Sequence, residues 1–169
     1  GIYLYSYNSK QNGLPEPKCL SNQERKPIAE KHFKQWFESA SNFYTIFSMT
    51  LEKGLLKEAA FQLHQSAERY FATLLLVHSN YRPKTHNIKR LQAMAIQLDS
   101  RIVSIFPQDS RFSRRCFELL KRAYIDARYS EHYKITEEEL TWLASEVGAL
   151  KQVVESICTA HINSLDSSA

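Results

Sequence analysis

The stretch from Ala60 to Leu91, AFQLHQSAERYFATLLLVHSNYRPKTHNIKRL, predicts a helix whose apolar face contains polar groups. Positions three and four residues apart share one face of a helix, so His64, Glu68 and Arg69 lie along one seam. The apolar residues of the same seam are Ala60, Leu63, Ala67, Phe71 and Leu74. Charged groups in such a seam form either a paired structural core or a pocket for an anion or a nucleotide. The pattern leaves both interpretations open.

Apolar periodicity on both sides of this stretch predicts further helices. The predicted helices span about residues 21–53, 55–79, 85–106, 110–129 and 136–162. Ser21 with Glu24, and Thr136 with Glu139, have the spacing of N-terminal capping boxes. Pro107 cannot continue the third helix. Five helices joined by short loops predict an all-α, up-and-down bundle.

The residues before and after the helices predict a simple domain organisation. Residues 1–12 alternate apolar or aromatic with polar side chains, which predicts a short strand, and residues 13–18 read as a proline-bearing linker. We therefore expect an extended leader at 1–20, one helical domain at 21–165 and a frayed tail at 166–169. Because no methionine precedes Gly1, we also expect that the chain is cut from a longer protein.

The bulk composition favours one domain of a cytoplasmic protein. A chain of 169 residues, 43% hydrophobic and 24% charged, has the size and composition of a single globular domain. The longest apolar run, residues 72–77, is too short to cross a bilayer, so no membrane partner is expected. The three cysteines are scattered, which argues against a disulfide framework and a zinc site. We expect a reducing cytoplasm, no metal and no cofactor.

Charge is divided unevenly along the second half of the chain. Basic residues outnumber acidic ones seven to three between residues 101 and 128, and acidic residues outnumber basic ones seven to two from 129 to 169. Such a division is typical of a solvated surface. A basic flank beside a polar seam is also what a phosphate-bearing ligand requires.

Three phrases, taken in order, resemble a known family. They are AAFQLHQSAERYFATLLL in the second predicted helix, THNIKRL at the entry to the third, and YIDARYSEHYKITEEEL near the end. From about Ala29 to Ile157 the chain resembles the HEPN domains, which are small helical modules. Many HEPN domains follow a minimal nucleotidyltransferase domain and pair as homodimers. The resemblance therefore implies a homodimer, and a leader that is the end of an upstream nucleotidyltransferase.

The resemblance also implies a nucleotide-binding or RNA-binding site between the second, third and fourth helices. The candidate residues are His64, Glu68, Arg69, His86, Arg122, Tyr124, Arg128 and Tyr129. Arginines engage phosphates, since a guanidinium binds two oxygens at once. Tyrosines stack on a base or bond to a sugar, and the glutamate orients an arginine or accepts from a ribose hydroxyl. The histidine at the start of the third helix lies where free backbone N–H groups favour anions.

An alternative function is a toxin-type, metal-independent endoribonuclease. Many HEPN ribonucleases use an arginine and a histidine separated by four to six residues, in which the histidine moves protons and the arginine stabilises charge on the phosphate. Arg128 and His132 are the candidate catalytic pair here, but only three residues separate them and the first is aromatic. Binding without turnover is therefore favoured. A further alternative is an interaction or dimerisation scaffold.

Overall fold

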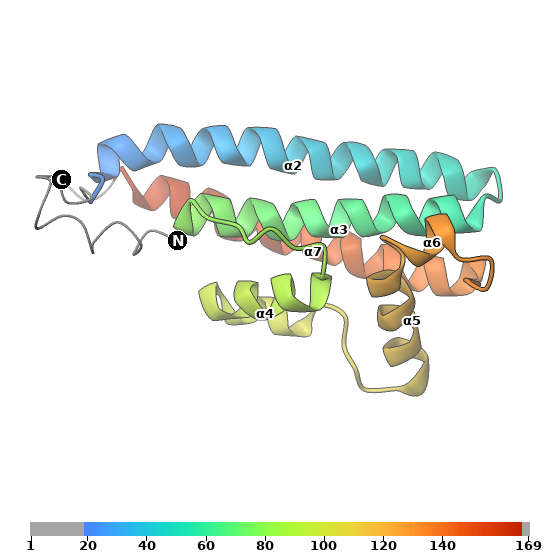
Figure 1. The fold of residues 1–169 in the computed structure, drawn as a ribbon. Helices are drawn as coiled ribbons and strands as arrows, with labels where there is room; N and C mark the ends of the chain where they lie inside the picture. Colours follow the sequence, from blue (N-terminus) through green and yellow to red (C-terminus); the bar gives the residue numbers. More distant parts are fainter. Residues whose placement is uncertain (1–18, 167–169) are drawn as a thin grey trace, which may run out of the picture.

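The computed structural model describes residues 19–166, and every regular element in that range is a helix (Figure 1). The elements are α2 (Asn22–Glu52), α3 (Leu56–Ser79), α4 (Ile88–Leu98), the 3-10 helix η2 (Ser100–Ser104), α5 (Arg111–Arg122), α6 (Asp126–Tyr129) and α7 (Glu137–Ser164). The all-α prediction is confirmed. The strand expected at residues 1–12 and the linker expected at 13–18 lie outside the described residues.

The body of the bundle consists of the three long helices α2, α3 and α7, and α3 is at its centre. Helix α3 packs against α2, α4, α5, α6 and α7 (Figure 1). Leu63, Tyr70, Phe71 and Leu74 of this helix have no exposed surface. Full burial of one such side chain stabilises the fold by roughly 1.5–3 kcal/mol. Because five elements pack around α3, the polar residues His64, Gln65, Ser66, Glu68 and Thr73 of this helix are buried as well.

The predicted capping residues begin the first and last described helices. Thr136 and Glu139 form a complete capping box, in which Thr136 Oγ1 accepts from the N–H of Glu139 and the Glu139 carboxylate accepts from the N–H of Thr136. Ser21 Oγ accepts from the N–H of Glu24, but the Glu24 carboxylate accepts from Ser21 Oγ instead of from its backbone. Both serine and threonine thus satisfy a free N–H at a helix start.

The third predicted helix ends earlier than expected, at Leu98 instead of near residue 106. Asp99 leaves the helical conformation, and its carboxylate accepts from the backbone N–H of Arg101 at 2.9 Å, which starts the separate helix η2. Phe106 then adopts a positive φ of 53° and donates its backbone N–H to Glu146 Oε1 of α7 at 2.9 Å. The third predicted helix therefore does not continue to residue 106, because Asp99 caps a new helix and Phe106 is hydrogen-bonded to α7.

The fourth predicted helix, residues 110–129, is two helices. Helix α5 ends at Arg122 and α6 begins at Asp126, and an ion pair of 2.9 Å between these two residues spans the break. A break frees backbone carbonyls, which must find other donors. Arg128 Nε donates to the carbonyl oxygen of Tyr124 at 2.7 Å. The break sets the position of Tyr124.

The two ends of the described range meet at one end of the bundle. Lys26 Nζ lies 2.6 Å from Asp166 Oδ2, so the first residue of the expected frayed tail is tied to α2. Residues 167–169 lie outside the described range. Within residues 19–166, no helix combines the length and the apolar character needed to cross a bilayer.

Candidate functional site

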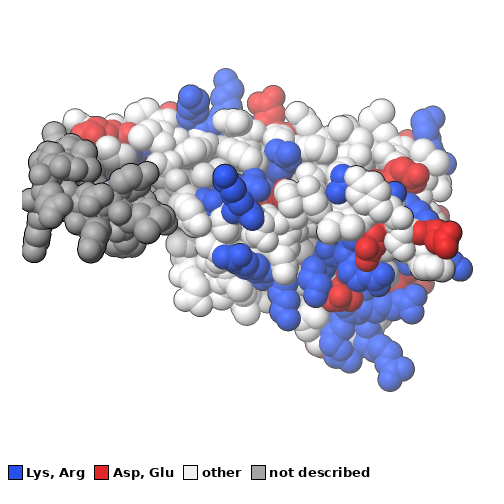
Figure 2. Space-filling model, in the orientation of Figure 1, with Lys and Arg blue, Asp and Glu red and all other residues white. Residues whose placement is uncertain are grey.

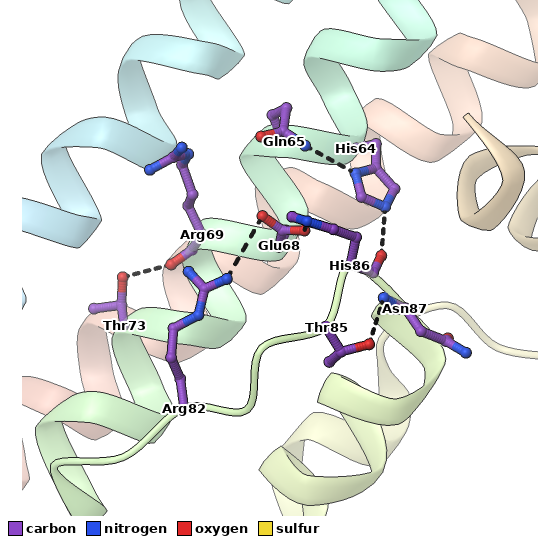
Figure 3. A network of polar contacts seen from close by, with 9 residues as sticks. All are labelled: His64, Gln65, Glu68, Arg69, Thr73, Arg82, Thr85, His86 and Asn87. Atoms are coloured by element: carbon purple, nitrogen blue, oxygen red, sulfur yellow. Dashed lines mark hydrogen bonds and ion pairs between the residues drawn. The ribbon is translucent and has the colours of Figure 1, made fainter. Parts of the chain in front are cut away.

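The buried carboxylate of Glu68 joins α3 to the loop of residues 80–87 (Figure 3). Its side chain is 3% exposed. Oε1 accepts from His86 Nδ1 at 2.7 Å, and Oε2 lies 3.9 Å from Arg82 Nη2. A buried carboxylate is tolerated only where partners replace its water. Glu68 therefore fixes the loop through two cationic or protonated groups.

His64, one turn before Glu68 on α3, binds the backbone of the same loop. Its Nε2–H donates to the carbonyl oxygen of His86 at 2.9 Å, and its Nδ1 accepts from Gln65 Nε2 at 3.3 Å (Figure 3). The carbonyl can only accept, which places the proton on Nε2. Burial lowers the pKa of His64 from 6.5 to about 4. His64 is thus a neutral structural tether near neutral pH.

The His86 ring stacks on Tyr124, which brings the loop against the α5–α6 break. The ring centroids are 3.8 Å apart and the planes are 14° from parallel. Arg128 Cζ lies 4.6 Å from the Tyr124 ring and 4.6 Å from the Phe61 ring. Because His86 Nδ1–H donates to Glu68 and the His86 side chain is 48% exposed, Nε2 is available to bond to a ligand.

An open depression of about 510 Å³ adjoins this stack. Its lining residues are Lys84, Thr85, His86, Asn87, Lys121, Arg122, Tyr124, Ile125 and Asp126. Three of them are cations, and only Asp126, paired with Arg122 at 2.9 Å, is an anion. Figure 2 shows that Lys and Arg side chains gather on this face over α5. The depression is therefore electrostatically suited to phosphate.

The structure brings most of the predicted site residues together. The cluster contains His64, Glu68, His86, Tyr124 and Arg128. Arg122 lines the adjoining depression. Tyr129 is 75% exposed and touches the cluster only through Arg128, whose Cζ is 4.9 Å from its ring. Arg69 lies apart, with its guanidinium packed on rings of α2.

The candidate ribonuclease pair is not assembled within one copy of the chain. In the described structure, Arg128 and His132 share no hydrogen bond, ion pair or ring contact. Arg128 is directed toward Tyr124 by its bond to the carbonyl of that residue. The His132 side chain is 87% exposed and lies 3.4 Å from the carboxylate of Glu131. The two side chains therefore occupy different surroundings.

Sequence reasoning missed Arg82, Phe61, Lys84 and Lys121 as parts of this region. Phe61 lies three residues before His64, so helical spacing alone could have placed it on the same face. The loop residues Arg82 and Lys84 gave no periodic signal, because their directions follow from how the loop crosses α3. Only the packed structure brings them to Glu68 and to the depression.

Within the range that the structure describes, the cysteines and the acidic residues form no second centre. Among residues 19–166, no group of three or more His, Cys, Asp and Glu side chains is arranged to hold a metal ion. Cys116 and Cys158 are buried, and burial raises the pKa of their thiols to about 11 and about 12. Both thiols stay protonated near neutral pH and pack as small apolar groups.

A protein-family match covers the part of the chain that builds this cluster. The HEPN domain model matches residues 33–157, a range that contains α3, α4, η2, α5 and α6 in full. No curated protein matches the chain in sequence. The matched range covers most of the chain and includes every residue of the cluster, and the fold is all-α as in that family. The chain belongs to the HEPN domain family.

Proposed function

We propose that this domain binds a phosphate-bearing nucleotide or an RNA segment, without turning it over, in the depression beside His86 and Tyr124. The observation that carries the proposal is the His86–Tyr124 stack, with centroids 3.8 Å apart, at the edge of a depression lined by Lys84, Lys121 and Arg122. The HEPN family consists of nucleotide-binding or RNA-binding modules and ribonucleases, which supports this class of ligand.

The roles of the side chains follow from their chemistry. Lys84, Lys121 and Arg122 hold phosphate oxygens, and the arginine can bind two oxygens at once. His86 Nε2 and the Tyr124 hydroxyl bond to a base edge or a sugar hydroxyl, and their rings offer an apolar wall. Glu68 sets the tautomer and direction of His86. In the free protein Glu68 holds His86, Asp126 holds Arg122 and Glu118 holds Lys121.

Binding is favoured over cleavage because only three residues separate Arg128 from His132, fewer than in the ribonucleases of the family, and the two side chains have different surroundings in one chain. The test is incubation of the purified protein with labelled RNA in EDTA. Intact RNA agrees with a binder. Cleavage that disappears in His132→Ala would instead favour the ribonuclease function.

The ligand site can be tested with nucleotides and a short single-stranded RNA. A ligand that binds only the native state must raise the melting temperature. Arg122→Gln is expected to weaken binding roughly tenfold, since a hydrogen bond to a charged group contributes about 1.5–3 kcal/mol. Arg111→Gln is the matched control, because Arg111 is exposed and outside the depression. If no nucleotide or RNA raises the melting temperature, the domain is an interaction scaffold.

We also propose that the domain pairs with a second copy of itself and serves a nucleotidyltransferase domain in the same protein. Membership of the HEPN family supports both proposals. Large apolar side chains that are exposed on one chain, including Ile46, Met49 and Ile125, offer surface for a partner. Light scattering of the purified protein measures the mass directly, and a monomer at all concentrations would contradict the dimer.

A further inference from the structure

Arg69 belongs to a second cluster of arginines and aromatic rings, on the α2 side of α3. Its Cζ lies 5.4 Å from the Trp36 ring centroid and 4.9 Å from that of Phe43. Arg82 Cζ, from the loop, also lies 4.9 Å from the Trp36 ring. Figure 3 shows Arg69 pointing toward α2, away from the contact between Glu68 and His86. We call Trp36, Phe43, Arg69 and Arg82 the α2 arginine cluster.

The Arg69 guanidinium has no hydrogen-bond acceptor among the described residues. Its Nε is buried and unpaired, and its terminal nitrogens, which are not buried, also donate to no described residue. Burial lowers the pKa of Arg69, the carboxylate of Glu68 opposes this, and the nearby Arg82 adds to the lowering. Aromatic faces attract the flat face of a guanidinium, but its N–H donors lie at the edge. Packing on Trp36 and Phe43 therefore leaves the donors of Arg69 without partners.

The charges around the cluster are not balanced. The Arg82 side chain is 20% exposed, and its nearest carboxylate oxygen is Glu68 Oε2 at 3.9 Å. The other oxygen of Glu68 is bound to His86 at 2.7 Å. No described carboxylate is within ion-pair distance of Arg69. The guanidinium groups of Arg69 and Arg82 thus share the Trp36 ring and one nearby carboxylate, that of Glu68, which also binds His86. A bound anion would therefore reduce the repulsion between the two guanidinium groups.

We propose that Arg69 and Arg82 form a second anion site, with Trp36 as its wall, that binds a phosphate group. Each of the two planar guanidinium groups can donate two parallel hydrogen bonds to a pair of phosphate oxygens. The site is separate from the depression beside His86, whose lining includes neither arginine. The phosphate comes from a free phosphate compound or from an RNA backbone, and both sources present the same oxygens.

Trp36 supplies a direct readout, because the chain has only two tryptophans. In Trp142→Phe, Trp36 is the sole indole, and an anion bound to the guanidiniums on its ring changes its emission. We expect a saturable change on titration with sodium pyrophosphate at constant ionic strength. Arg69→Gln and Arg82→Gln, each made in Trp142→Phe, weaken the apparent affinity by roughly tenfold or more. Arg111→Gln, with the same loss of charge, leaves it unchanged.

A parallel titration with a short single-stranded RNA distinguishes the two sources. A response to pyrophosphate that needs Arg69 and Arg82 assigns the site to free phosphate compounds, and a response to RNA alone assigns it to a phosphodiester backbone. Either supports the proposal. Melting temperatures and circular dichroism show whether each variant is folded, and Arg82→Gln gives the decisive result if Arg69→Gln loosens the contact with α2.

Two results would overturn the inference. One is the lack of any saturable Trp36 response to pyrophosphate and to RNA. The other is a response that survives in both Arg69→Gln and Arg82→Gln but disappears in Arg122→Gln, which would place the anion in the depression. Because Arg122→Gln tests the depression and the other two variants test the α2 arginine cluster, failure of one site leaves the other open to measurement.

Discussion

Acid sensitivity is a direct consequence of the burial of His64. The imidazole has no exposed surface, its Nε2–H donates to the carbonyl of His86, and its pKa in the folded state is about 4 instead of 6.5. In the unfolded chain the ring takes up a proton once the pH falls below about 6.5. The unfolded state then binds more protons than the folded state, so stability rises with pH in this window and falls as the pH is lowered.

The magnitude follows from the difference between the two pKa values. Each tenfold change in proton affinity corresponds to about 1.4 kcal/mol, so a fall from 6.5 to about 4 corresponds to about 3 kcal/mol. This loss begins below pH 6.5 and is complete below about pH 4. A typical domain is stable by only about 5–15 kcal/mol, so the titration of His64 alone removes a large share of that stability at low pH.

Urea unfolding followed by circular dichroism, repeated from pH 7 down to about pH 4, measures this effect. His64→Gln is the control, since its side-chain amide can still donate to the His86 carbonyl but does not titrate in this range. His78, whose pKa burial also lowers, is present in both proteins and cancels in the comparison. The wild type should lose about 3 kcal/mol more than the variant. Equal pH dependence in both would refute the reasoning.

Further predictions concern single contacts in the core and the cluster. Glu68→Ala leaves the His86 ring and the loop without their anchor, and should lower the free energy of unfolding by about 2 kcal/mol, measured in urea; an unchanged midpoint would contradict the anchoring role. Tyr133→Phe removes the bond of 2.7 Å to the buried carbonyl of Leu119, with an expected loss of about 1–2 kcal/mol in the same assay. Phe71→Ala opens a cavity in the centre of the bundle, and thermal melts should show a loss of about 3–5 kcal/mol; a loss below about 1 kcal/mol would argue against full burial.

The sequence predicted which segments are long helices, because periodicity and capping depend on residues that are close in the chain. The stripe of α2, the apolar run of α3 and the capping box of Thr136 and Glu139 each follow from residues at most four positions apart. The break between α5 and α6 was not predictable in this way. It is maintained by the bond from Arg128 to the Tyr124 carbonyl and by the stack of Tyr124 on His86, and His86 lies far away in the chain.

The sequence predicted which residues belong to the candidate site better than it predicted how they are arranged. The unusual polar residues of α3 and the tyrosines and arginines after α5 were visible as residue types in apolar surroundings. Arg82 and Lys84, in contrast, reach the site only through the path of their loop. Loop directions depend on the surface that the loop crosses, which no short window of sequence contains.

Glu68 and Arg69 show where the boundary lies between the two kinds of information. The sequence by itself determined that both residues belong to one helix that is buried in a bundle. Successive residues of an α-helix are turned by about 100°, since 3.6 residues complete a turn. The tertiary structure alone decided which neighbour covers each direction, so that Glu68 meets the loop of residues 80–87 while Arg69 meets the rings of α2. Two adjacent charges consequently serve two different surfaces.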